Sequence, residues 1–186
     1  MTTASRSFTD IVLGPAAPWR ECGECNACCD MLGIDTPALQ KDPGTLCPHC
    51  TSAGCAIYAE RFPVCRSYFC VWRRIAALPE DARPDRLSVF MHLAYPRPAP
   101  NPLMHAYIGL MPITSWDDVS LEALETALAV LRTGALPVWR INEENEELLH
   151  PSPAIAGTAE ADAWVRSHAA YAEAPKPTPP YSAAAK

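Results

Sequence analysis

The chain has 186 residues, of which 49% are hydrophobic, and its formal net charge is -6. This length suits one compact domain with tails or with a small appendage, and the apolar content is sufficient for a hydrophobic core. The acidic balance argues against nucleic acid as a partner, because phosphate contacts require a basic face.

The beginning of the chain shows no pattern of a secretory signal. Its apolar stretch, Ile11–Leu13, is short and runs directly into Gly14 and Pro15. The sequence also contains no apolar run of about 18 residues, the length that a membrane-spanning helix needs. We therefore expect a cytoplasmic protein that contacts neither a membrane nor nucleic acid.

The cysteines divide the chain, because all nine lie between Cys22 and Cys70. We expect an irregular lead-in over residues 1–20, a cysteine-cluster metal-binding module over 21–83, an α+β part over 84–172 and a disordered tail over 173–186. Prolines and glycines throughout the module disfavour long helices. The expected fold class is α+β, with a small, irregular, metal-stapled cysteine-rich module packed on a short sheet with one or two helices.

Four strands are expected in the second half of the chain. Two apolar, partly aromatic runs, Leu87–Tyr95 and Leu103–Met111, have the composition of strands. A third strand is expected at Val138–Ile141 and a fourth around Glu147–His150.

Two helices are expected beside these strands. Leucines at helical spacing predict the first helix: Leu121, Leu124, Leu128 and Leu131. Ser115 with Asp118, or Ser120, suits its start, and Gly134 suits its end. A weaker helix is expected over Glu160–Ala172.

We expect the second half of the chain to pack against the cysteine module. The expected contacts come from Phe90, His92 and Tyr107, and from the leucine face of the first helix. These apolar strands and this helix offer more apolar surface than an exposed appendage should carry.

The densest group of cysteines comprises Cys22, Cys25, Cys28 and Cys29. In a reducing compartment, clustered cysteines act as ligands or catalysts more often than as disulfides. Two cysteines separated by two residues bend readily in a tight turn, so that both sulfurs reach one metal ion. Since neighbouring side chains diverge, Cys29 is expected to serve a second metal or to bridge two.

The second group follows at wider spacing: Cys47, Cys50, Cys55, Cys65 and Cys70. The two groups together supply enough thiolates for two four-coordinate sites. Thiolates suit both zinc and iron, and three cysteines at this spacing also resemble the run that holds an iron–sulfur cluster. Zinc or iron, and two mononuclear sites or one cluster with spare thiols, are therefore alternatives.

These residues resemble the YkgJ-type cysteine-cluster proteins, which are described as zinc- or iron-chelating domains. The family pattern is C-x2-C-x2-C-C, a lone cysteine, and then a Cys-x-Ile-Tyr segment that ends in Cys-Arg. The resemblance covers about residues 21–90 and implies that eight cysteines bind metal: Cys22, Cys25, Cys28, Cys29, Cys47, Cys55, Cys65 and Cys70. This sequence departs from the pattern at Phe62, where proline is usual, and in Cys50, which is additional to the eight.

Several polar side chains near the cysteines have two interpretations. Arg61 and Arg66 either offset the negative charge of thiolates or form solvated pairs with residues such as Glu60. His49, between Cys47 and Cys50, has a positional claim as a ligand, whereas His92 and His105 are more easily explained as ordinary strand histidines. Three aromatic residues are expected to cover the metal: Tyr58, Tyr68 and Trp72. An acidic run is expected to be a solvated turn rather than a cation site: Glu143, Glu144, Glu146 and Glu147.

Three functions fit this sequence. The favoured one is a metal-chelating protein, binding zinc or iron in a structural or carrier role. The second is an iron–sulfur enzyme or redox protein, since similar clusters occur in flagellin lysine methylases. The third is an interaction module in which zinc fixes a surface for a protein partner.

Overall fold

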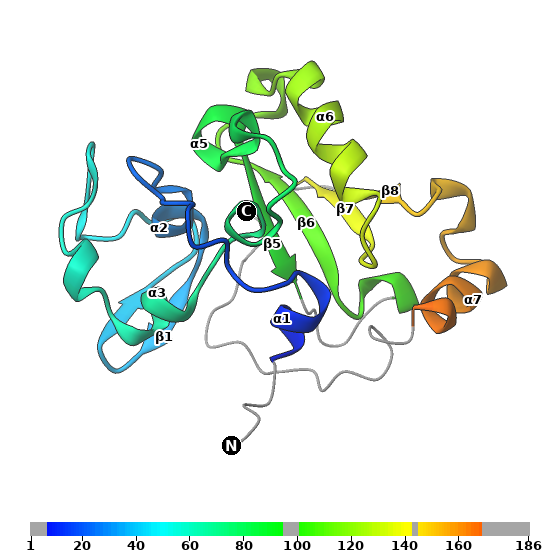
Figure 1. Ribbon diagram of the computed structural model, residues 1–186, viewed down its shortest axis with the longest axis horizontal. Coiled ribbons are helices and arrows are strands. Elements are labelled where there is room, and N and C mark those ends of the chain that lie inside the picture. Colours follow the sequence, from blue (N-terminus) through cyan, green and yellow to red (C-terminus); the bar gives the residue numbers. More distant parts are fainter. Residues whose placement is uncertain (1–6, 95–100, 143–144, 169–186) are drawn as a thin grey trace.

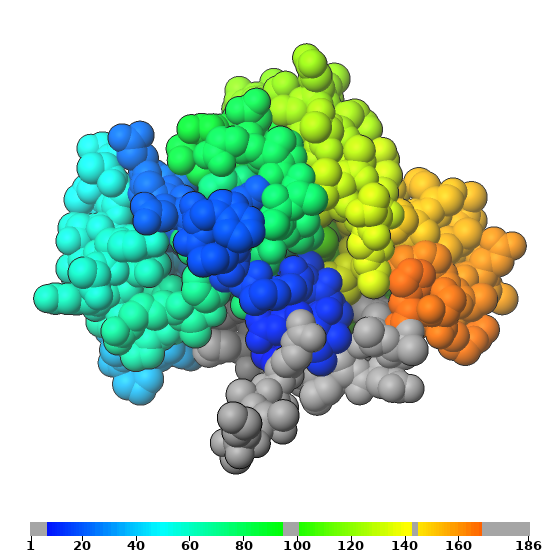
Figure 2. Space-filling model, in the orientation of Figure 1, coloured from blue at the N-terminus to red at the C-terminus, as the bar shows by residue number. Residues whose placement is uncertain are grey.

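The cysteine module lies at one side of a central sheet, and two helices lie at the other side (Figure 1). The computed structural model describes residues 7–94, 101–142 and 145–168. In the space-filling view, the module and the sheet part touch along a continuous contact that the N-terminal segment crosses (Figure 2). The expected α+β class is confirmed.

Short elements build the module. They are α2 Ala27–Met31, β1 Ile34–Thr36, β2 Leu39–Lys41, β3 Cys50–Thr51, β4 Gly54–Cys55, the 3-10 turn η1 Tyr58–Glu60, α3 Pro63–Ser67 and α4 Val71–Arg74. Strands β1 and β2 form one antiparallel hairpin and strands β3 and β4 form another. None of the helices from α2 to α4 exceeds five residues, as the prolines and glycines predicted.

The lead-in is not wholly irregular, which corrects the expectation for residues 1–20. Residues Phe8–Val12 form the helix α1, which starts at a capping box. The Asp10 backbone N–H donates to Ser7 Oγ at 3.1 Å, and the Asp10 carboxylate accepts from the Ser7 backbone N–H. Phe8 is buried beneath this turn. A Ser-x-x-Asp pattern followed by apolar residues was the signal for this helix.

The central sheet has four strands: β5 Val89–Ala94, β6 Tyr107–Pro112, β7 Val138–Ile141 and β8 Glu146–His150. Their order is β5-β6-β7-β8, with β6 and β7 parallel and the outer pairs antiparallel. All four expected strands exist. The second starts later than expected, because residues Pro102–Met104 form the 3-10 turn η3, which Asn101 caps.

Both faces of the sheet are covered. Along β5, Val89 and Met91 join the core cluster that includes Leu128, whereas Phe90 packs with Ala27 and Leu32 of the module. Successive strand residues point to opposite faces, so β5 contacts the helix α6 on one side and the cysteine module on the other. The expected contact of Phe90 with the module is confirmed.

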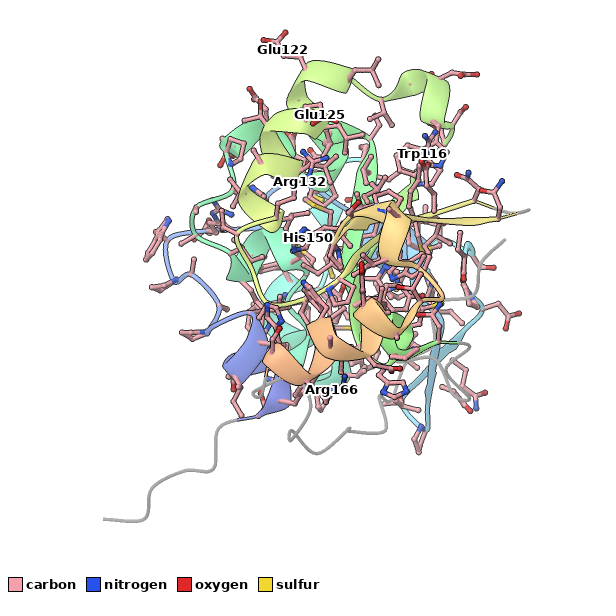
Figure 3. All side chains as sticks on the ribbon, turned by 90° about the vertical axis from the view of Figure 1, so that its right-hand side faces the viewer. Trp116, Glu122, Glu125, Arg132, His150 and Arg166 are labelled. Atoms are coloured by element: carbon pink, nitrogen blue, oxygen red, sulfur yellow. The ribbon has the colours of Figure 1, made fainter. Side chains whose placement is uncertain are left out.

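Helix α6 Leu121–Leu131 starts at Ser120, whose Oγ accepts the Ala123 N–H at 3.3 Å. Leu128 and Leu131 are buried in the cluster that contains Val71 of α4, as expected. Leu121, however, is 76% exposed, so its expected core contact is wrong. It lies in the first turn, before the helix reaches the core, and the neighbouring Glu122 and Glu125 side chains also point outward (Figure 3).

The remaining short elements connect or flank the sheet. They are η2 Glu80–Ala82, α5 Pro84–Leu87, η4 Trp116–Asp118, η5 Pro153–Ile155 and α7 Ala159–Ser167. Ser115 caps η4 rather than α6. Residues 169–172 of the last expected helix and the expected tail, 173–186, lie outside the described residues. No helix in the described parts of the chain is long and apolar enough to cross a membrane.

Arg20 is a buried charge that holds the end of α4. Its guanidinium donates to the carbonyl oxygens of Ile75 at 3.1 Å and Ala76 at 3.2 Å, and also to those of Trp72 and Leu78. It also lies over the Trp72 ring, 4.5 Å from the centroid. A helix end leaves carbonyl groups without partners, and Arg20 supplies the donors that these carbonyls need.

Replacing Arg20 with methionine should lower the free energy of unfolding by about 3 kcal/mol, because buried carbonyls lose a charged donor. Urea unfolding of the full chain measures this change. Arg20→Lys should recover only part of the loss, since an ammonium lacks the planar fork of donors. Arg132→Met is the matched control on the exposed face of α6, where Arg132 pairs with Glu125, and should cost well under about 1 kcal/mol. Equal losses for Arg20→Met and Arg132→Met would contradict this role.

His92 should make the fold sensitive to acid. It is buried on β5, its ring stacks on Phe90 with centroids 5.6 Å apart, and burial lowers its pKa to about 4. The unfolded chain binds this proton near pH 6.5, so the contribution to stability is complete above that pH and is lost between about 6.5 and 4.

The size of the loss follows from this pKa difference and is about 3 kcal/mol. His92→Phe keeps a ring above Gly109, where a side chain at 109 would collide with it. This variant should therefore remove that part of the pH dependence in urea unfolding between pH 7 and pH 4. Identical pH profiles of the two proteins would show that His92 does not titrate as described.

Candidate metal centre

Eight of the nine cysteines line one hollow of about 90 Å³ between the cysteine module and the sheet. They are Cys22, Cys25, Cys28, Cys29, Cys47, Cys55, Cys65 and Cys70. This is the same set that the family resemblance implies. Cys50 does not line the hollow, and all nine cysteines, which lie in described residues, are free thiols.

Four of these cysteines form a first set, which we call group A: Cys22, Cys25, Cys28 and Cys70. The thiols of Cys28 and Cys70 interact electrostatically with each other and with Cys22, and Cys25 interacts with Cys22 and Cys70. Three of the four also pack around the ring of Phe90. Group A therefore sits against strand β5 of the sheet.

The other four form group B: Cys29, Cys47, Cys55 and Cys65. The Cys65 thiol interacts electrostatically with all three of its group members. Cys29, Cys47 and Cys65 also share a small apolar cluster with Ile34 and Val64. Group B is therefore held within the module itself, away from the sheet.

Tight turns bring the cysteines of each motif together. The Cys25 N–H donates to the Cys22 carbonyl at 3.0 Å, and Gly23 between them has a φ of +56°. Helix α2 then carries Cys28 and Cys29 at adjacent positions, about 100° apart around the axis, which sends one sulfur to each group. The Cys47 N–H donates to the Cys29 carbonyl at 2.9 Å and joins the two halves of the motif.

The hairpin of β3 and β4 packs directly on the first cysteine turn. A Cβ atom at Gly54 would lie 2.7 Å from the Gly23 carbonyl oxygen, closer than such atoms approach. Gly54 also has a φ of +99°, which side-chain-bearing residues rarely adopt. Glycine at this position therefore lets the hairpin that carries Cys55 contact the turn that carries Cys22.

Hydrogen-bond donors surround the sulfurs of group A. Backbone N–H groups of Ala27 and Asp85 donate to Cys25, and that of Arg73 donates to Cys70. The Arg73 guanidinium lies 3.6 Å from the Cys22 sulfur. Such donors stabilise the thiolate form that metal binding requires.

Two cations lie near group B. Lys41 and Arg61 both lower the pKa of Cys29 electrostatically, after the larger effect of the thiol hydrogen bonds. Arg61 also lies over the Tyr58 ring, 3.7 Å from the centroid. Neither Arg61 nor Arg66 forms an ion pair with Glu60 in the described part of the chain.

Sequence reasoning missed Arg73 and Lys41. The signal for Arg73 was its position three residues after Cys70, about one helical turn further along α4. Lys41 gave no signal, because β2 places its ammonium group against the backbone carbonyls of Asp30, Leu32 and Asp42 only in the folded chain.

The thiols differ in how strongly they hold their protons. Burial raises the pKa of Cys25 to about 11 and that of Cys70 to about 12. Cys28 donates its S–H to Cys29, which raises the pKa of Cys28 and lowers that of Cys29. Cys29 is therefore the readiest of these sulfurs to become a thiolate, and it lies where the two groups meet.

The other candidates divide between the hollow and the rest of the fold. His49, Tyr58 and Tyr68 line the hollow, whereas His92 and His105 do not, and His105 follows η3 instead of lying on a strand. Trp72 also lies outside the lining and packs on Arg20. Glu146 and Glu147 are exposed on β8, and Glu143 and Glu144 lie outside the described residues.

The donor set fits a soft or borderline metal such as zinc or iron. Thiolates, buried surroundings and N–H donors to sulfur are features of such sites. In the described chain, no three side chains of His, Cys, Asp or Glu already surround a common point at metal-binding distance. Instead, sulfurs hydrogen-bond to one another, as Cys28 does to Cys29.

Comparison with known proteins adds no relative. No family model matches this chain, and neither the curated proteins nor the solved structures contain a match.

Replacing Gly54 with alanine should disturb this centre more than the same change at Gly14. Both glycines have positive φ, but nothing lies near a Cβ at Gly14, whereas Gly54 faces the Gly23 carbonyl. The backbone conformation alone should cost about 1 kcal/mol at Gly14, and strain plus the collision about 3 kcal/mol at Gly54. Urea unfolding measures both, and Gly54→Ala should also speed the reaction of Cys22 and Cys55 with a thiol reagent. Equal costs at the two positions would mean that the hairpin tolerates separation from the first cysteine turn.

Proposed function

We propose that this chain is a metal-binding protein that holds zinc or iron with its cysteine cluster, in a structural or metal-carrier role. The observation that carries the proposal is the convergence of eight cysteines on one hollow in two groups of four. Cysteines that served only as small apolar residues would have no reason to gather in this way.

The number and type of donors support one metal ion in each group. Four thiolates in tetrahedral arrangement form a complete structural zinc site. Binding a structural zinc ion contributes on the order of 10 kcal/mol of folding free energy. The module has few buried apolar residues of its own, so a contribution of this size would stabilise it.

One shared iron–sulfur centre is the second candidate. The contact between Cys28 of group A and Cys29 of group B favours it, because it brings sulfurs of both groups together. Such a centre would suit a redox protein or an enzyme. The two candidates differ in whether the groups lose metal separately or together.

The family resemblance and the compartment belong to the same proposal. The eight cysteines of the YkgJ-type pattern are those that line the hollow, which supports membership without a family match. Nine free thiols suit the reducing cytoplasm, where disulfides are rare.

Serine substitutions should separate the two groups. Purified anaerobically, the chain should contain two metal equivalents, and Cys28→Ser and Cys65→Ser should each lose a different one. The double variant should lose both, and Cys50→Ser is the matched control that should keep both. Elemental analysis and the visible spectrum measure the stoichiometry and the metal.

The same measurements identify the alternatives. If either single substitution removes all the metal and a sulfide-derived absorption, one shared iron–sulfur centre replaces the two-site proposal. A colourless protein with two zinc ions supports it. A full-length chain that binds neither metal with reduced thiols would overturn metal binding altogether.

A further inference from the structure

Cys50 is a ninth thiol that touches group B from outside the hollow. It lies on strand β3, and its S–H donates to the Cys29 sulfur. It also interacts electrostatically with Cys47. Group B is therefore a set of four thiols with a fifth in contact.

The position of Cys50 gives it access to solvent. It is half-buried at the base of a hairpin whose next three residues, 51–53, are exposed. The Cys50 N–H donates to the Cys47 carbonyl at 2.9 Å, which fixes the thiol beside a group B member. Cys50 thus connects the group to the surface.

Group A has no such additional thiol. Its members pack against Phe90, which is fully buried, and against the buried Leu32. A tenth cysteine does not exist in the chain. The two groups therefore differ in access, although each has four cysteines.

We propose that Cys50 is an exchange ligand for group B, so that group B takes up and releases its metal while group A keeps its own. This inference rests on the proposed metal-binding function and adds to it a division between a carrier site and a structural site. It needs no oxidant, because only ligands are exchanged.

The exchange step conserves atoms and charge. Cys50 gives up its S–H proton to water and forms a bond to the metal, while one of the four original metal–sulfur bonds breaks. The released thiolate takes a proton from water, so the metal keeps four thiolates and its charge. Zinc sites tolerate a transient increase in ligand number, which allows the new bond to form before the old one breaks.

The test follows transfer of zinc from the full-length, two-zinc protein to a chromophoric chelator. The wild-type chain should transfer one zinc quickly and one slowly. Cys50→Ser should slow the fast phase by about tenfold or more, by analogy with other residues next to metal ligands. It should leave the slow phase and the zinc content unchanged.

A relocated thiol provides the matched control. In the double variant Cys50→Ser, Thr51→Cys, the thiol moves to the neighbouring strand position, which points to the opposite face, and fast transfer should stay slow. Rescue in this variant would overturn the requirement for Cys50, and so would an unchanged rate in Cys50→Ser. Loss of one zinc in Cys50→Ser would make Cys50 an ordinary ligand and also overturn the exchange role.

These outcomes are distinct from failure of the proposed function. A wild-type chain that binds no zinc or iron fails both proposals. A chain that binds two zinc ions but transfers them independently of Cys50 fails only the exchange proposal.

Discussion

The carbonyl groups at the end of α4 impose the constraint on which the centre of the molecule depends. Four of them point inward, and the buried guanidinium of Arg20 donates to all four. Helix α4 begins at Cys70 and carries Arg73, whose N–H and guanidinium donate to sulfurs of group A. The helix also contributes Val71 to the core beneath α6. One arginine from the N-terminal segment thus fixes a short helix that belongs both to the cysteine hollow and to the main core.

The regular half of the fold was largely predictable from the sequence. The apolar runs around Phe90 and Ile108 are continuous because both faces of the sheet are covered, and such runs identify strands without alternation. Leu128 and Leu131 followed from helical spacing. Leu121 shares that spacing but lies one turn too early to reach the core, which periodicity cannot reveal. Helix α1 was missed because it has only five residues, too few for a periodic pattern.

The candidate site was predictable as a set of residues but not as an arrangement. Cysteine spacing identified the thiols, because motif geometry is local. The division into two groups was not visible, since Cys70 joins Cys22 and Cys25 across the whole module and Cys55 joins Cys65. The cations near the sulfurs were equally hidden, because Lys41 acts from a hairpin whose position depends on tertiary packing.

The placement of Phe90 has a consequence for the order of events during synthesis. All nine cysteines precede strand β5 in the chain, yet Phe90 of that strand covers group A in the folded molecule. At roughly 5–20 residues per second, the ribosome adds the roughly 20 residues between Cys70 and Phe90 in about 1–4 s, and α6 follows a few seconds later. The complete set of thiols therefore leaves the ribosome before the surface that shields it. Whatever reaches these sulfurs in that interval meets them uncovered, and the sheet closes over the result.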